Sequence, residues 1–174
     1  MRLSASLFLL SVVTALSLVA CGSGESNVVQ GNRAGILHVG NGTEPQGLDP
    51  HVVTGIPESN IVRALFEGLV VKNPHTLEPE PGVAQSWDIS DDGLTITFHL
   101  NPEARWSNGD PMTAQDYVWS WRRALNPAMG NQYAYMLYPI ENAEAFATGK
   151  LDDFSEVGVK ALDQHTLQVQ LNAR

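Results

Sequence analysis

The stretch that decides the fold is residues 87–127, WDISDDGLTITFHLNPEARWSNGDPMTAQDYVWSWRRALNP, which holds all four tryptophans of the chain. Asp91-Asp92-Gly93 is typical of a turn, because glycine supplies a positive φ and aspartate bonds its own backbone. After it, apolar residues alternate with polar ones through Leu94, Ile96, Phe98 and Leu100. Alternation with a period of two indicates a half-buried strand. We therefore predict a strand before this turn and another after it.

The second half of the stretch predicts a helix. Asn108-Gly109-Asp110-Pro111 is a turn, Thr113 is a candidate N-cap, and Asp116 lies where a capping box places its acidic residue. Apolar residues then recur at helical spacing, at Tyr117, Val118, Trp121 and Leu125. Asn126-Pro127 ends the helix, because proline disfavours helical geometry at the residue before it. These positions lead us to expect at least three of the four tryptophans in the core, although the four could also form a stacking surface for a ligand.

Composition narrows the class of protein. The chain has 174 residues, 43% of them hydrophobic and 17% charged, with a formal net charge of -9 and a pI of about 4.8. These values fit a globular protein, and the acidity argues against nucleic acid as a partner because binding to phosphate requires positive charge. Cys21 is the single cysteine, so an intrachain disulfide is impossible.

The N-terminus has the pattern of an export signal. Residues 1–20 combine Arg2 with a long apolar run, and Leu18-Val19-Ala20-Cys21 resembles the bacterial lipobox, in which the cysteine is lipidated. Such an anchor would be firm because each buried CH₂ contributes about 0.8 kcal/mol. The alternative is an uncleaved membrane helix with an incidental cysteine, for which a run of about 18 residues is short. We interpret 1–20 as a lipoprotein signal peptide and 21–32 as the linker that follows the lipidated Cys21.

Weaker patterns predict further elements. Apolar spacing, glycine and proline indicate the following elements: a strand at 36–39, an extended segment at 52–57, a helix whose apolar face is Ile61, Val62, Leu65, Phe66 and Leu69, a strand at 70–71, a short helix at 143–147, and a hairpin from Val157 to Leu171.

A search for catalytic residues finds no constellation. The five histidines are scattered with none at i, i+4 spacing, and neither a G-x-S-x-G elbow nor a P-loop is present. The acidic pairs Asp91-Asp92 and Asp152-Asp153 fall in turn-like surroundings, which favours solvated loops over acid/base pairs. We therefore expect no enzyme, no cofactor and no metal site, and the pattern favours a binding protein.

The ordered motifs of the chain resemble a known family. In order they are Gly42-x-Glu44-Pro45-x-x-Leu48-Asp49-Pro50, Phe66-Glu67-Gly68-Leu69, Pro81-Gly82-Val83-Ala84-x-x-Trp87, Asp92 to Leu100, and Trp106-Ser107-Asn108-Gly109-Asp110-Pro111-x-Thr113-Ala114-x-Asp116-Tyr117-Val118. They resemble the oligopeptide-binding lipoproteins of ABC peptide importers, within the extracellular solute-binding proteins of family 5 (peptide/nickel-binding type). Ser120-Trp121-Arg122-Arg123 and Gly158 to Asp163 favour the oligopeptide type over dipeptide, nickel and haem binders.

The resemblance implies an α/β fold of the class II, two-lobed periplasmic-binding-protein type. Members of the family are several times longer, so we expect an N-terminal fragment. It would comprise the start of the first lobe at 33–66 and most of the extra β-rich α+β domain at 67–174, truncated at its C-terminus. The implied location is the cell envelope, in the periplasm or on the outer cell surface, with a lipid anchor at Cys21.

The resemblance also implies a function and a site. The family captures extended oligopeptides mainly through their backbone and delivers them to the transmembrane subunits of an ABC permease. Thr54-Gly55-Ile56 matches a backbone partner of the peptide, and glycine there would let the ligand backbone approach closely. Tyr133 resembles an aromatic residue that lines a side-chain pocket. The acidic residue that holds the peptide's amino terminus belongs to the lobe that this chain lacks.

Two alternatives stay open from the sequence. The ligand could be a cell-wall or signalling peptide, nickel or haem instead of a nutrient peptide. The chain could also belong to an exported hydrolase whose site residues lie beyond Arg174.

Overall fold

The computed structural model describes residues 25–173, and it divides at Gly40 into two compact units. In the first unit, helix α2 (Asn27–Ala34) begins at Ser26, whose hydroxyl accepts a hydrogen bond from the N–H of Val29. It ends at Gly35, which has the left-handed φ of 68° that glycine allows. α2 thus begins inside the range expected as a linker, whereas the predicted signal peptide and Cys21 lie outside the described residues.

The strand predicted at 36–39 is wrong. These residues are irregular, and Ile36, Leu37 and Val39 are exposed. A strand needs a neighbour to pair its backbone groups, and the described part of this unit contains no other strand.

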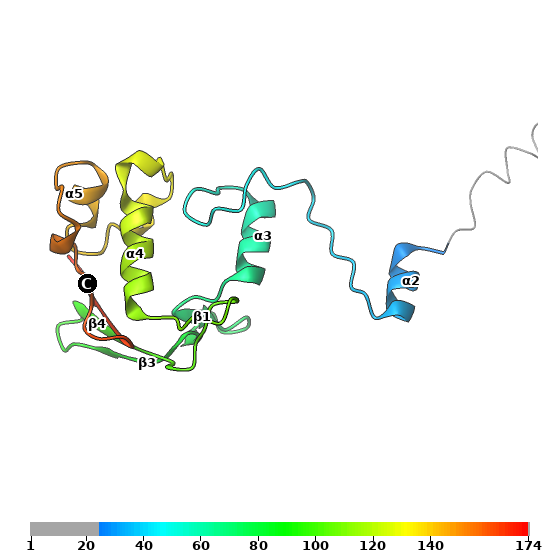
Figure 1. Ribbon diagram of the computed structural model, residues 1–174, viewed down its shortest axis with the longest axis horizontal. Coiled ribbons are helices and arrows are strands. Elements are labelled where there is room, and N and C mark those ends of the chain that lie inside the picture. Colours follow the sequence, from blue (N-terminus) through cyan, green and yellow to red (C-terminus); the bar gives the residue numbers. More distant parts are fainter. Residues whose placement is uncertain (1–24, 174) are drawn as a thin grey trace, which may run out of the picture. The chain divides into compact units, whose positions relative to one another are not determined.

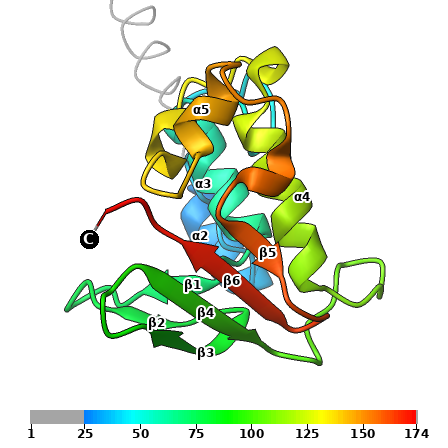
Figure 2. The same ribbon diagram turned by 90° about the vertical axis from the view of Figure 1, so that its left-hand side faces the viewer.

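The second unit is built on an antiparallel sheet of four strands. Its order is β3 (Ala84–Ile89), β4 (Thr95–Leu100), β6 (Thr166–Gln170) and β5 (Val159–Ala161). Phe98 lies opposite Trp87 on one side and Leu167 on the other. The predicted strand–turn–strand of the central stretch and the predicted terminal hairpin are both confirmed, and Figure 2 shows β4 and β6 side by side although about seventy residues separate them in the chain.

The core forms where helix α4 (Ala114–Leu125) and helix α5 (Ala143–Ala147) lie on one side of this sheet (Figures 1 and 2). α4 begins as predicted, since the Asp116 carboxylate accepts hydrogen bonds from both the N–H and the hydroxyl of Thr113. Its end at Asn126-Pro127 is also confirmed. The buried cluster comprises Ala84, Leu100, Ala114, Leu125, Ile140, Ala143, Phe146, Phe154, Val157, Val159, Leu167 and Val169.

The expectation that at least three tryptophans pack in the core is wrong. Trp106 is 38% exposed and Trp119 is 60% exposed, and Trp87 is only half-buried. Trp121 alone packs against the buried cluster. The reason is helical geometry: Val118, Trp121 and Leu125 share one stripe of α4, and Trp119 lies off that stripe.

Helix α3 (Ile56–Leu65) begins earlier than the apolar pattern predicted and ends before Phe66. Ile56 and Pro57 form its first turn instead of an extended segment, because proline's missing N–H costs nothing at a helix start. A two-stranded sheet follows, of β1 (Val70–Lys72) and β2 (Pro79–Pro81). Short 3₁₀ turns complete the unit at Pro127–Met129, Ala134–Leu137 and Phe154–Glu156. Between residues 25 and 173, no helix is both long enough and apolar enough to cross a membrane.

Candidate functional site

The predicted backbone site Thr54-Gly55-Ile56 lies where a loop enters helix α3. Thr54 is exposed, Gly55 is half-buried and Ile56 is 78% exposed, so this segment lies at the surface. Gly55 is the N-cap of α3 in an extended conformation (φ -87°, ψ 155°), and its carbonyl accepts the N–H of Ser59. An extended surface segment followed by a helix start is a geometry with which an incoming extended chain can pair.

Tyr133 lies beside this loop, although 79 residues separate it from Thr54. Its hydroxyl donates to the carbonyl of Thr54 at 3.4 Å, which is long for a hydrogen bond. The Tyr133 ring is 43% exposed, and its centroid is 6.1 Å from that of Tyr135. The structure therefore brings together the two regions that the sequence singled out separately.

The structure explains glycine at position 55 through its neighbour Glu58. A Cβ on Gly55 would lie 2.0 Å from Oε2 of Glu58. Glu58 is buried, and its Oε1 accepts the N–H of Gln46 at 2.7 Å. That bond, together with one from the backbone N–H of Glu58 itself, lowers the pKa of Glu58, so the carboxylate stays ionised at the helix start. Because φ of Gly55 is ordinary, space and not backbone strain requires glycine here.

A polar network that sequence reasoning missed joins this loop to α4. The guanidinium of Arg123 donates to both carboxylate oxygens of Asp49, at 2.7 and 2.6 Å. His51 contacts Arg123 through Nδ1 and lies 2.8 Å from the Ser120 hydroxyl through Nε2. We call Asp49, His51, Ser120 and Arg123 the polar clamp. Figure 1 shows the loop before α3 approaching α4.

The electrostatics of the polar clamp favour a neutral histidine between two charged groups. The guanidinium of Arg123 and, after it, the N–H of His51 hold the pKa of Asp49 well below its usual range. Burial, reinforced by the charge of Arg123, lowers the pKa of His51 below its ordinary value of 6.5, and Asp49 opposes that shift. Since Nδ1 faces the Arg123 donor, the proton of neutral His51 is assigned to Nε2, which donates to Ser120.

The signal for the polar clamp was present in the sequence. Leu48-Asp49-Pro50 and Ser120-Trp121-Arg122-Arg123 were both recognised as motifs, but nothing in the spacing showed that they contact each other across 74 residues. The ring of Trp119 completes the contact, with its centroid 6.5 Å from that of His51 in an edge arrangement. Trp119 therefore has a neighbour outside the core, which accounts for its exposed position.

The polar clamp contains serine, histidine and aspartate, yet its geometry does not match a hydrolase triad. Nδ1 of His51 is 3.7 Å from Asp49, and the Arg123 guanidinium occupies both carboxylate oxygens. In a triad the histidine donates from Nδ1 to the carboxylate, whereas here Nδ1 faces a donor. Across residues 25–173 there is also no group of three or more His, Cys, Asp or Glu side chains placed to hold a metal ion.

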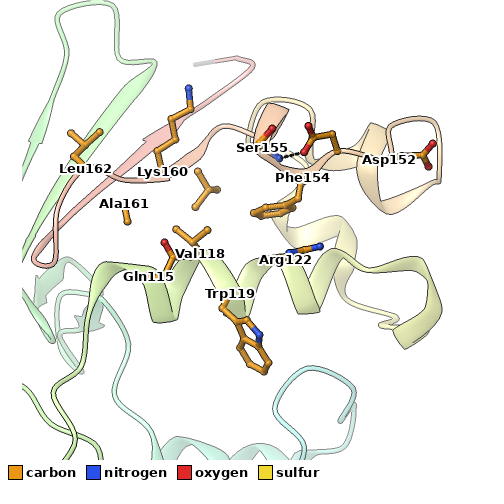
Figure 3. A pocket seen from close by; sticks show the side chains of 12 residues that line it. Gln115, Val118, Trp119, Arg122, Asp152, Phe154, Ser155, Lys160, Ala161 and Leu162 are labelled. Carbon is orange, nitrogen blue, oxygen red and sulfur yellow. Dashed lines mark hydrogen bonds between the residues drawn. The ribbon is translucent and has the colours of Figure 1, made fainter.

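A groove of about 630 Å³ lies on the opposite side of α4. Its lining includes Val118 and Arg122 from α4, Phe154, and Lys160 from β5. Trp119 also contributes to the lining, although Figure 3 shows its ring pointing away from Val118 and Phe154, toward the other side of the helix. The groove is open and mixes apolar, acidic and basic side chains, and none of the residues predicted for the site lines it.

Comparison with known proteins places these features in context. The family model described as "Bacterial extracellular solute-binding proteins, family 5 Middle" matches residues 78–174. The chain is 48% identical to the periplasmic oligopeptide-binding protein OppA of Escherichia coli (strain K12) over 134 residues, which are 76% of this chain and 24% of that protein. The chain thus spans about a quarter of the length of this curated relative.

Solved structures show the same fold. The crystal structure of Haemophilus influenzae OppA in complex with the peptide RPPGFSPFR is similar with a TM-score of 0.71 and 45% identity, over 76% of this chain and 26% of that one. The Escherichia coli murein tripeptide-binding protein MppA is similar with a TM-score of 0.69 and 44% identity, over 74% of this chain and 25% of that one. These likenesses confirm the expected α/β fold, as part of a two-lobed binding protein.

Proposed function

The chain belongs to the bacterial extracellular solute-binding proteins of family 5, and from this premise we propose that it is part of the peptide-binding component of an ABC importer. In this proposal the protein captures extended oligopeptides and delivers them to the membrane subunits of a permease, without catalysis of its own. The observation that carries the proposal is the surface segment Thr54-Gly55-Ile56, which lies beside Tyr133. Relatives named for binding oligopeptides and a murein tripeptide support it.

The mechanism is pairing of main chains. An extended peptide donates and accepts backbone hydrogen bonds along Thr54 to Ile56, while the exposed ring of Tyr133 lines one of its side chains. Backbone pairing is independent of sequence, so one site accepts many peptides. Each bond contributes about 1 kcal/mol net, whereas a micromolar Kd needs about 8 kcal/mol. One side of a cleft alone therefore binds weakly, and the opposite lobe of a full-length relative supplies the remaining contacts.

The proposed location is the cell envelope, with an anchor at Cys21, which lies outside the described residues. If lipidation holds the protein on the membrane, Cys21→Ser releases it into the soluble fraction of cells. An unchanged membrane fraction for Cys21→Ser would instead favour an uncleaved helix. The mature N-terminus, measured by mass spectrometry, distinguishes the two cases independently.

A cell-wall peptide is the second candidate ligand. The likeness to MppA, at 44% identity, is nearly as high as that to OppA from Haemophilus influenzae, at 45%. Neither value separates nutrient peptides from murein peptides. For nickel, no group of three or more His, Cys, Asp or Glu side chains among residues 25–173 is placed to hold the ion, and for a hydrolase the polar clamp lacks the geometry of a triad.

Titrations with matched peptides test the proposal. We expect tri-alanine and tri-lysine to bind the chain with similar, weak affinities in the millimolar range, measured by chemical-shift changes in NMR spectra. A tri-alanine with N-methylated amides should bind much more weakly, because methylation removes the donors. Equal binding of methylated and unmethylated peptides would contradict backbone recognition, and micromolar binding in calorimetry would contradict a one-sided site.

A further inference from the structure

His51 of the polar clamp lies three residues before Thr54, the first residue of the proposed peptide site, and this proximity suggests a role. We propose that Arg123 is a positioning residue for Thr54-Gly55-Ile56 and that protonation of His51 loosens its hold, so that the site is ordered at neutral pH and mobile in acid. The inference rests on the proposed function, because it concerns the order of the same loop. Its test uses the peptide-free chain, so the result does not depend on whether the chain binds peptide.

The loop is built outward from Asp49. The N–H groups of Val52 and Val53 both donate to the carbonyl of Asp49 at 3.2 Å, and the N–H of His51 donates to its side chain at 3.1 Å. Asp49 therefore fixes the four residues that follow it, and Thr54 comes next. Whatever holds the Asp49 carboxylate in place also determines where the Thr54 carbonyl lies.

Few other contacts tie this loop to α4. The Asn41 side chain donates to the carbonyl of Pro57, the N–H of Gln46 donates to Glu58, and the Asn60 side chain donates to that of Asn41. All three bonds stay within the loop and α3. Within residues 25–173, the hydrogen bonds that join residues 41–65 to residues 114–173 are those of the polar clamp and the long bond from Tyr133. Arg123 donates the two bonds to Asp49, at 2.7 and 2.6 Å, and its two-pronged geometry fixes direction as well as distance.

His51 makes this hold sensitive to protons. Its side chain is only 14% exposed. The charged groups that face it are Asp49 from its own loop and Arg123 from α4, with the neutral Ser120 and Trp119 beside them. A proton on Nδ1 removes the acceptor for Arg123 and places a second positive charge against the guanidinium. The lowered pKa of His51 agrees with this arrangement, because both burial and Arg123 disfavour the charged ring.

NMR on the peptide-free chain tests the proposal. Hydrogen exchange of the Val52 and Val53 amides, corrected for intrinsic rates, reports opening of the loop, and heteronuclear NOE values report the mobility of Thr54 to Ile56. For Arg123→Gln we expect a modest effect, about fivefold faster exchange at Val52 and Val53, because the ion pair with Asp49 is partly exposed. Arg123→Lys should restore only part of the protection, because lysine lacks the fork.

Matched controls separate the clamp from general effects. Arg122→Gln removes the neighbouring arginine, which lines the groove on the other side of α4, and should leave the loop unchanged. Lowering the pH from 7.5 to 5.5 should raise exchange at Val52 and Val53 in the parent chain and not in His51→Gln. His99→Gln, which removes the exposed histidine paired with Asp88 at 2.8 Å, should keep the pH response.

Several outcomes would overturn the proposal. The first is hydrogen exchange at Val52 and Val53 that does not change in Arg123→Gln. The second is exchange that rises as much in Arg122→Gln as in Arg123→Gln, and the third is exchange that still rises at low pH in His51→Gln. Arg123→Gln could also open the core, which would appear as faster exchange of the Leu167 amide. In that case Asp49→Asn, which breaks the same ion pair from the loop side, decides whether the loop depends on this pair. A loop that responds as expected in a chain that binds no peptide would support the clamp and reject the proposed function.

Discussion

The sheet with α4 and the loop before α3 are held by opposite kinds of contact. The sheet packs apolar side chains such as Leu167 and Leu125, which are 0% and 1% exposed, against one another. The loop contributes few buried apolar side chains and is fixed by Asp49, Arg123 and Glu58, whose contacts are polar and directional. Apolar packing tolerates small shifts, whereas a polar clamp fixes one geometry. Stability and site geometry are therefore separable in this chain.

The largest effect should come from the core. Leu167→Ala removes a fully buried side chain opposite Phe98, and we expect it to lower the free energy of unfolding by about 2–5 kcal/mol. Urea denaturation followed by circular dichroism measures this loss. Leu162→Ala, at a side chain that is 54% exposed, is the control and should change stability by less than about 0.5 kcal/mol. Comparable losses in both variants would remove the distinction between core and surface.

The next effect should be confined to the loop. In Gly55→Ala the new methyl group meets Glu58 at 2.0 Å, so we expect a loss of about 1 kcal/mol in stability together with shifted amide signals from Thr54 to Glu58. The double variant Gly55→Ala/Glu58→Ala removes the obstacle and should return the Thr54 and Ile56 signals toward their original positions. Signals that stay displaced in the double variant would show that glycine is needed for a reason other than space.

Acid should weaken the loop before it weakens the sheet. His51 has a lowered pKa in the folded chain, so the unfolded chain binds more protons once the pH falls through 6.5, the ordinary pKa of histidine. The contribution of His51 to stability is therefore complete above pH 6.5 and is lost as the pH falls from there to its folded pKa. Asp49, also with a lowered pKa, loses its contribution only in stronger acid. The free energies of unfolding of the parent and of His51→Gln, measured by denaturation, should therefore draw together as the pH falls from 7.5 to 5. A difference between them that stays constant with pH would contradict this.

The smallest effect should follow Tyr133→Phe. The bond to the Thr54 carbonyl is 3.4 Å long and exposed, so its removal should change stability by less than about 0.5 kcal/mol. The ring remains, and peptide binding by NMR should fall no more than about twofold, whereas Tyr133→Ala should lower it further. A large loss of stability in Tyr133→Phe would show that this hydroxyl, and not the polar clamp, holds the loop.

Local patterns predicted the sheet and α4 because the same residues determine both local conformation and burial. Alternation from Leu94 to Leu100 and the cap at Thr113 are signals within a few residues of each other, and the structure confirms both. The strand at 36–39 failed because a short apolar run does not show whether a partner strand is present. The prediction for the tryptophans failed because a position within a strand or helix does not show which face is buried, and Trp119 lies off the buried stripe of α4.

The candidate site could be predicted only in part. The resemblance singled out Thr54 to Ile56 and Tyr133, and the structure places them together, while their role in binding stays a prediction. The polar clamp could not be derived, because a contact across 74 residues depends on the tertiary fold. The contact of Glu58 with Gly55 spans three residues, yet it depends on a rotamer that the sequence does not show.

The most direct test of the account is to find which amides respond when an extended peptide is added to the chain. We predict that tri-alanine at millimolar concentration shifts the signals of Thr54, Gly55, Ile56 and Tyr133, and leaves those of Val118 and Lys160 in the groove unchanged. Shifts that cluster in the groove, with none from Thr54 to Ile56, would contradict the account.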